Sequence, residues 1–411
     1  MRLVRRLLLL GLILYFGAWA YRIVTRKYYV WLPGYVSWLF HQEKAAGAPV
    51  HVFFSSSITS SRARTAAMMD RWVSEYPKIA GPASRQRGAP VAAHVVLPGE
   101  QPIDRNMTAL QKLVAGGYGE TELHLHHFND TPQSARERFQ RAIAWFQTFG
   151  FLRCADGATH FGFIHGNWSL DNSRGNAFCG NNRELAMLRE LGCFGDYTFS
   201  SIFYESQPSS VNNIFEATDD DRRNPTIAAW RCGLASEPAG DLLIFQGPLL
   251  LVPTARPAKL FLEVENAGDS RGGAGHAAPR GRLDAGQHPR GRTSRVAVRQ
   301  DPHARRQRQG RTRTRFWGPE LDQALTYMEK TYNDGAHYVL HYVTAREAFN
   351  RGAGGGGWEA GRSAAVLRLF GSAVCGEFAA LRAPEPEIGW RARAPAHVYE
   401  ALVIGCRRRR S

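Results

Sequence analysis

Apolar positions along the central part of the chain follow two alternating periods. Short apolar runs such as 49–54 predict strands, and stretches with an apolar residue every three or four positions, such as 66–81, predict amphipathic helices. Strands that alternate with helices of about a dozen residues are typical of βα units around a parallel sheet. The same alternation predicts further elements at 106–130, 134–151, 160–172, 182–201, 240–253 and 320–350.

The N-terminal residues 1–27 predict a membrane anchor or a signal segment. The apolar run LLLLGLILYFGAWAY follows three arginines, and Arg22, Arg26 and Lys27 close it. The run approaches the length of a membrane span if the apolar pair after Arg22 is counted. A cleaved signal peptide is the alternative. The Tyr and Trp residues in 28–48, which we expect to be a juxtamembrane linker, favour an uncleaved, single-pass, N-terminal anchor. Basic residues on both flanks leave its orientation open.

Five stretches break the α/β pattern and are rich in Arg, Gly, Ala, Pro and Ser. They show neither helical nor strand period, and we expect 266–315 to be a disordered insertion and 351–411 a disordered basic tail. The insertion has 13 Arg against 3 acidic residues and the tail has 10 Arg against 5, which supplies 15 of the net 16 positive charges. Because the charge is confined to these two segments, nucleic-acid binding is disfavoured. The other three stretches are 55–65, 82–97 and 222–239.

A shifted reading frame would explain the composition of these stretches. Codons for 55–65, regrouped by one base, can spell FVDHFEPGTD, which would continue the strand 49–54 into an Asp-His pair. A sequence encoding 299–310 can be regrouped to VKIHTHGANDK, again a strand followed by histidines. On this hypothesis the basic run at 299–315 is an accident of the frame.

The stretch ETELHLHHFND, residues 120–130, carries the first candidate site. On a strand, His124 and His126 point to one face, and His127 lies at the carboxyl edge, where ligands bind in parallel α/β folds. Imidazole is the most common ligand of zinc-like divalent metals, so these three histidines are the predicted metal ligands. The alternative is a set of partly buried structural histidines that donate to carbonyl groups.

The stretch FIHGNWSLDNSRG, residues 163–175, carries the second candidate site. The predicted substrate-binding residues are His165, Asn167, Trp168 and Asp171, on a loop at the same end of the sheet. Trp168 could stack on a pyranose ring, and the alternative is a packing Trp beside a turn that Asp171 or Asn172 caps. The six cysteines show no zinc-site spacing, and no phosphate-binding loop or nucleophile elbow occurs.

The succession ELHLHHFND, FIHGNWSLDNS, LRELGCFGDYTFSS, DLLIFQGPLL and YVLHYVTAREAF resembles the polysaccharide deacetylase (NodB-homology) group of the glycoside hydrolase/deacetylase superfamily, in a divergent membrane-anchored branch. The resemblance covers most of residues 49–350. It implies a distorted (β/α) barrel that holds a metal through one Asp and two His, with a first-strand Asp as base and a late His as acid. His124 with His126 or His127 would correspond to the histidine pair, although the HxxxH spacing of that family is absent.

The resemblance implies a metal-dependent hydrolase that removes acyl groups from a carbohydrate. The first-strand carboxylate and the late histidine are missing as written, and both fall where the shifted frames yield VDHFEP and KIHTHG. We therefore expect the activity of this exact chain to be impaired. The alternative from another class is a non-catalytic glycan-binding or scaffold membrane protein on the same barrel, which is favoured if the histidines bind no metal.

Overall fold

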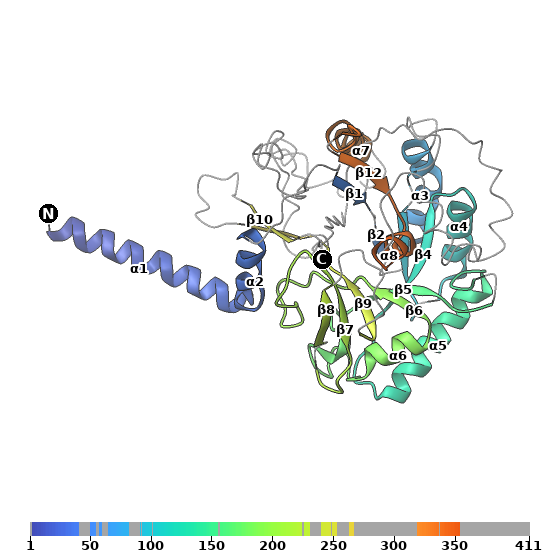
Figure 1. Cartoon of the computed structure of the whole chain (residues 1–411), viewed down its shortest axis with the longest axis horizontal. Coiled ribbons are helices and arrows are strands. Elements are labelled where there is room, and N and C mark those ends of the chain that lie inside the picture. The colour runs from blue at the N-terminus through green and yellow to red at the C-terminus, as the bar shows by residue number, and fades with distance from the viewer. Residues whose placement is uncertain are drawn as a thin grey trace, which may run out of the picture.

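The alternation of strands and helices expected between 49 and 350 is present in the computed structural model (Figure 1). The structure describes residues 2–40, 50–54, 57–59, 65–81, 91, 93–100, 102–154, 157–223, 226–230, 240–247, 249–252, 263–266, 319–336 and 338–353. The expected disordered insertion 266–315 lies outside the described residues except for its first residue, and the expected basic tail 351–411 lies outside them except for its first three.

The largest sheet has the strand order β2-β3-β4-β5-β6-β9-β7-β8, and every neighbouring pair from β2 to β9 is parallel. Strand β7 lies antiparallel to both β9 and β8. The mainly parallel sheet confirms the expected α/β class. Among the described strands this sheet does not close on itself, and the expected distorted (β/α) barrel stays a prediction. Its strands are β2 (Ser57–Thr59), β3 (Ala93–Pro98), β4 (Gly119–Leu125), β5 (Phe161–His165), β6 (Cys193–Asp196), β7 (Ile214–Thr218), β8 (Thr226–Trp230) and β9 (Leu242–Phe245).

Five of the described helices contribute apolar side chains to one core with this sheet. They are α3 (Thr65–Ala80), α4 (Asp104–Ala115), α5 (Pro132–Thr148), α6 (Glu184–Glu190) and α7 (Pro319–Thr331). Helix α5 begins at a capping box, in which Thr131 and Ser134 each bond the other's backbone N–H, and Pro132 occupies the first turn. Phe139 and Phe146 of α5 are completely buried, which stabilises the fold by about 2 kcal/mol each.

Two further strand pairs lie outside the largest sheet. Strand β1 (Val50–Phe54) pairs in parallel with β12 (Tyr338–Tyr342), and β10 (Leu249–Val252) pairs antiparallel with β11 (Glu263–Asn266). Helix α7 (Pro319–Thr331) precedes β12 and α8 (Ala345–Ala353) follows it. An ion pair between Arg346 of α8 and Glu120 of β4 links these C-terminal elements to the sheet.

The N-terminal helix α1 (Arg2–Thr25) projects from the body (Figure 1). Its segment Leu3–Thr25 is long and apolar enough to cross a membrane, a property that a signal sequence shares. Helix α2 (Tyr28–Phe40) occupies most of the expected linker 28–48, and it packs on the body. Its buried aromatic face contacts Ile202, Val211 and Leu249, and the Trp31 indole N–H donates to the carbonyl oxygen of Ile202 at 3.1 Å.

The structure differs from the expected pattern in three of the Arg/Gly/Ala-rich stretches. It places β2 within 55–65, most of β3 within 82–97 and β8 within 222–239, although their sequences show no clear strand period. Pairing with a neighbouring strand can form a strand without a local alternation, because the neighbouring backbone supplies the hydrogen bonds. Strand β3 is paired on both sides, and the edge strands β2 and β8 are paired on one side each. The strand expected at 240–253 is two strands, β9 and β10, separated by residues 246–248.

Candidate metal centre

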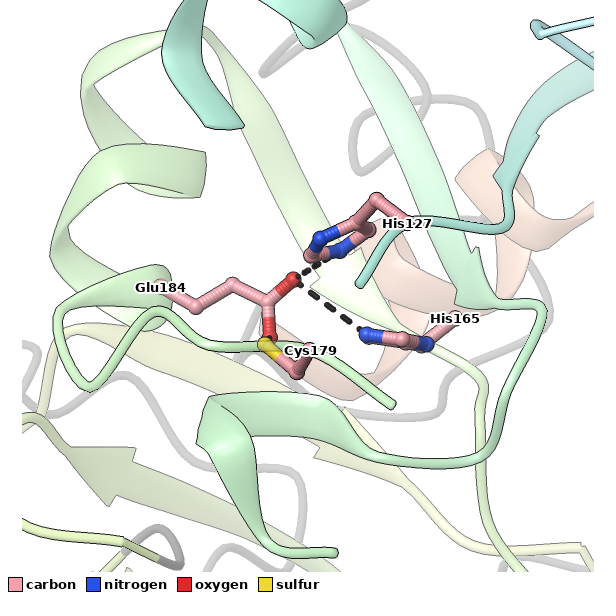
Figure 2. Close-up of side chains that lie close together, drawn as sticks. All are labelled: His127, His165, Cys179 and Glu184. Atoms are coloured by element: carbon pink, nitrogen blue, oxygen red, sulfur yellow. Dashed lines mark hydrogen bonds and ion pairs between the residues drawn. The ribbon is translucent and has the colours of Figure 1, made fainter. Parts of the chain in front are cut away.

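Four potential metal ligands converge beside the carboxyl ends of β4 and β5 (Figure 2). His127 follows β4, His165 ends β5, Cys179 lies in the following loop and Glu184 begins α6. All four residues are buried, and one ligand atom from each lies within 4.8 Å of the others. We call these four residues the donor cluster.

The Glu184 carboxylate lies at the middle of the donor cluster. Its Oε1 is 2.8 Å from His127 Nε2 and 3.7 Å from His165 Nε2, the two contacts dashed in Figure 2. Its Oε2 is 3.5 Å from Cys179 Sγ and accepts the backbone N–H of Asp171 at 2.7 Å. Burial raises the pKa of the Cys179 thiol, and the nearby Glu184 charge raises it further. A thiol beside a carboxylate therefore keeps its proton unless a cation replaces it.

The His127 imidazole is held between two carboxylates. Its Nδ1 lies 3.2 Å from Asp130 Oδ2, opposite the contact with Glu184. Burial acts to lower the pKa of His127, but the charges and hydrogen bonds of Glu184 and Asp130 outweigh it and raise this pKa to about 9. The ring is thus an imidazolium at neutral pH, and a proton occupies the position that a cation would take on Nε2.

Asp130 is itself fixed by neighbours from α5. Ser134 Oγ and Arg138 Nε donate to its Oδ1 at 2.7 and 2.9 Å. Burial acts to raise its pKa, but the hydrogen bonds from His127, Ser134 and Arg138 lower it to about 2. Its backbone N–H donates to the Cys179 carbonyl oxygen at 3.0 Å. Gly180 has φ +107°, and a Cβ there would lie 2.5 Å from the Asp130 backbone, so glycine permits this close approach.

His165 presents Nε2 to the cluster and uses Nδ1 elsewhere. Its Nδ1 accepts the Asn167 backbone N–H at 3.1 Å, and its Nε2 has no hydrogen-bond partner within the described part of the chain. Burial lowers the pKa of His165 well below its usual range, with a further decrease from His127. The neutral ring with Nδ1 as acceptor carries its proton on Nε2, so ligation through Nε2 requires loss of that proton or of the Asn167 contact.

Asp171 is a second unusual carboxyl group beside Glu184. It lies in the one-turn 3₁₀ helix Leu170–Asn172 with φ +54°, and both of its carboxyl oxygens are buried without a hydrogen-bond partner among the described residues. Burial, followed by the charges of Asp219 and Glu184, raises its pKa to about 9. A non-glycine residue in a left-handed conformation at such a position is typical of functional sites.

Of the three predicted metal ligands, the structure brings His127 alone into the donor cluster. His124 and His126 form a separate pair with ring centroids 4.6 Å apart, and His126 Nδ1 lies 2.6 Å from Glu100 Oε1. Side chains alternate along β4, so His124 lies on the face opposite Leu123 and Leu125, whereas the His127 ring packs on Phe139 of α5. Both ring nitrogens of His124 are buried without a partner in the described ranges, and burial, then His126, lowers its pKa to about 3.

The predicted substrate-binding residues divide between the donor cluster and its rim. His165 belongs to the cluster, and Asp171 lies against Glu184. The Asn167 side-chain amide donates to the His127 carbonyl oxygen at 2.8 Å, which ties the two strand ends together. Trp168, with φ +49°, packs its ring 5.7 Å from that of Tyr204.

An arginine extends this aromatic contact. The Arg174 guanidinium lies 3.8 Å from the ring centroids of both Tyr204 and Phe178, and its Nη1 donates to the Asn167 carbonyl oxygen at 2.5 Å. We call Trp168, Tyr204, Arg174 and Phe178 the aromatic stack. Because planar rings and a guanidinium pack well on pyranose faces, the stack is a candidate carbohydrate platform.

Cys179 and Glu184 were not predicted from the sequence. The four donors come from four separate segments, so no local ligand spacing identifies them, and Glu184 has the appearance of an ordinary acidic residue in a first helical turn. The available signal was the position of both residues between His165 and the next strand, on the same carboxyl edge as His127.

No family model, curated protein or solved structure matches the chain. The function must therefore be inferred from the geometry and chemistry of the site.

Proposed function

We propose that the protein is a membrane-anchored, metal-dependent hydrolase that removes acyl groups from a carbohydrate, on a distorted (β/α) barrel of the polysaccharide deacetylase type. The observation that carries the proposal is the convergence of two imidazoles, a carboxylate and a thiol at the carboxyl edge of adjacent parallel strands. This edge is where ligands bind in parallel α/β folds.

The donor cluster fits a zinc-like divalent ion. Zn–N bonds of about 2.0–2.1 Å and Zn–S bonds of about 2.3 Å place the ligands of a tetrahedral ion roughly 3.3–3.7 Å apart. Glu184 Oε1 lies 3.7 Å from His165 Nε2 and 2.8 Å from His127 Nε2, a contact now bridged by a proton, whereas the 3.5 Å separation from Cys179 Sγ is that of Oε2. With one ligand atom from each residue, all four atoms lie within 4.8 Å of one another, so small side-chain movements would bring them onto one ion. Asp130 behind His127 supplies the carboxylate that a metal-ligating histidine usually has on its other nitrogen.

A bound divalent ion would polarise an acyl carbonyl group and lower the pKa of a water molecule. The side chains supply the remaining functions. Asp130 fixes the orientation of His127, and Asp171, with a pKa of about 9, holds a proton at neutral pH that it could give to a leaving group. Trp168 and Tyr204 would position the sugar ring, because aromatic faces pack against its C–H groups.

The separate strand pair supports the barrel part of the proposal. In a closed ring of strands the first strand must pair with the last, and β1 pairs in parallel with β12. Closure would need two further contacts, one between β1 and β2 and one between β12 and the other end of the large sheet. The first of these falls where the sequence 55–65 departs from the regular pattern.

Metal content and turnover test this proposal together. The full-length protein should bind about one zinc ion per chain, and it should release acetate from N-acetylated glycans more slowly than the frame-restored protein does. His127→Gln should abolish both, whereas the matched control His160→Gln, which removes a histidine outside the cluster, should retain both. A chain that binds no metal and releases no acetate, even after the segments 55–65 and 299–310 are restored to the alternative frame, would refute the hydrolase.

A second candidate is favoured by the burial of the donors. Four protein ligands complete a tetrahedral shell, and closed shells of this kind are typical of structural zinc sites. The protein would then be a non-catalytic glycan-binding or scaffold protein with a stabilising metal. Retention of the metal, with glycan binding but without acetate release in the frame-restored protein, would select this candidate.

A further inference from the structure

Three consecutive residues connect the end of the N-terminal helix to the aromatic stack. The Arg26 guanidinium lies 4.7 Å from the ring centroid of Phe203, and the Lys27 ammonium pairs with Glu205. Between them, Tyr204 packs on Trp168 and Arg174 of the stack. Residues 203 and 205 therefore contact the turn that follows α1, and residue 204 contacts the candidate sugar platform.

Helix α2 fixes this arrangement. Its buried aromatic residues pack on Ile202, immediately before the connecting segment, and Trp31 bonds the Ile202 backbone. A helix with a fully buried Trp and two buried Tyr residues does not act as a flexible tether. The body is thus held to α1 in one orientation.

The opposite side of α2 continues the apolar surface of α1. Tyr29, Val36 and Phe40 are exposed on α2, and the apolar side chains of α1 are exposed along its length. The 23 residues of Leu3–Thr25 match the thickness of a bilayer core of about 30 Å. The basic residues Arg22, Arg26 and Lys27 flank this apolar segment, as is usual beside a membrane span, so the occupant of this surface is a lipid bilayer.

Hydrogen bonds connect the aromatic stack to the donor cluster. The Trp168 backbone N–H donates to the His165 carbonyl oxygen at 2.9 Å, and Arg174 donates to Asn167, whose amide bonds the residue His127. The part of the site that would hold a sugar is therefore also the part nearest to the end of α1.

From this geometry we propose that the site faces the membrane surface and acts on an acylated saccharide carried on a membrane lipid. The inference rests on the proposed hydrolase function and adds its substrate class. A lipid-carried saccharide is confined to the layer into which the stack projects, which raises its effective concentration at the site. A soluble glycan of the same structure gains no such advantage.

A quenching experiment on the full-length protein in phospholipid vesicles tests the orientation without any turnover. Azidophenylalanine replaces Phe178, which is 37% exposed in the stack. As a control it replaces Lys78, whose side chain is 65% exposed on α3, a helix at the upper right of the body in Figure 1, whereas α1 leaves the body at the left. A fluorophore is attached to each azide, and the vesicles contain head-group-labelled quencher lipid. We expect quenching at position 178 and none at position 78. Equal quenching at the two positions, or none at either, would overturn the orientation.

A substrate comparison tests the chemical class. The frame-restored, vesicle-bound protein should release acetate from N-acetylglucosamine linked to diacylglycerol about tenfold faster or more than from a soluble N-acetylglucosamine oligosaccharide. Equal rates would overturn the inference while the hydrolase proposal stands. If neither saccharide is hydrolysed, the hydrolase proposal fails, and photo-crosslinking through the unreacted azide at position 178 decides the inference. Crosslinks to the diacylglycerol-linked saccharide in excess of the soluble one would support it, and their absence would overturn it.

Discussion

Two histidines at the carboxyl end of β4, His127 and His124, differ in the groups that surround their imidazole rings. His127 lies between Glu184 and Asp130, and Asp130 is in turn bonded by Ser134 and Arg138. His124 is equally buried but has no hydrogen-bond partner on either nitrogen among the described residues. Two carboxylates stabilise charge on the first ring, whereas burial keeps the second ring neutral. A potential metal ligand is therefore better identified by the groups behind it than by its position in a run of histidines.

Metal binding should show the largest difference between the two groups. His127→Gln should abolish zinc binding at zinc concentrations that saturate the native protein, because it removes one metal ligand together with the contact through which Asp130 orients that ligand. His124→Gln should leave the zinc stoichiometry unchanged. Isothermal titration calorimetry with zinc measures the stoichiometry of both variants. An equal loss of zinc binding in the two variants would show that the metal site includes His124 as well as His127.

Stability should show the next largest difference. Glu184→Gln removes a carboxylate from a buried ion pair and should lower the free energy of unfolding of the metal-free protein by about 3 kcal/mol. Glu100→Gln, which removes the partner of His126, should lower it by less, since this pair is partly exposed to solvent and the pair of Glu184 is fully buried. Denaturant titrations with a chelator present compare the two variants. A smaller loss for Glu184→Gln than for Glu100→Gln would contradict the central position of Glu184.

The pH dependence of stability should have opposite signs for the two histidines. The folded pKa of His127 is raised to about 9, so its contribution is fully present below about 6.5, the unfolded value, and is lost as the pH rises through 9. The folded pKa of His124 is lowered to about 3, so stability is lost as the pH falls from 6.5 toward 3, because the unfolded chain binds the proton first.

Unfolding free energies of the metal-free protein between pH 4 and 9 measure both effects. In His127→Gln, the free energy of unfolding should fall less as the pH rises toward 9 than it does in the native chain. The pKa shift of His127 limits this difference to about 3 kcal/mol. Glu122 and Asp196, whose pKa values burial raises to about 8, also weaken the fold in this range, so the native chain is the necessary reference. An unchanged alkaline limb in His127→Gln would mean that the imidazolium is not stabilised by its carboxylates.

The smallest expected effect concerns the support of His127. Asp130→Asn preserves the shape of the side chain but removes the charge behind the ring, and it should weaken zinc binding by about 10- to 100-fold. A full loss of binding would indicate that the loop carrying Cys179 has moved, which the circular dichroism spectrum and the unfolding midpoint would detect.

The sequence predicted most of the elements near the site but only part of the site itself. The period of apolar positions located α4, β4, α5, β5 and α6, and the carboxyl-edge rule placed His127 and His165 at one end of the sheet. Strands β7 and β8 were missed because tertiary pairing, not local pattern, forms them.

The local sequence could not predict which of the histidines joins the donor cluster. The pattern HLHH predicts that His124 and His126 share one face of a strand only if the strand includes both residues, and β4 ends at Leu125. The partners that distinguish His127, namely Cys179 and Glu184, lie more than fifty residues away in the chain. Such contacts depend on the packing of α6 against the strand ends, which no spacing rule encodes.

X-ray absorption spectroscopy of the zinc-loaded, full-length protein tests the donor cluster most directly. We predict a four-coordinate shell with two imidazole nitrogens, one carboxylate oxygen and one sulfur at about 2.3 Å, and loss of this shell in His127→Gln. A shell without sulfur, or one that persists unchanged in His127→Gln, would show that the metal binds elsewhere.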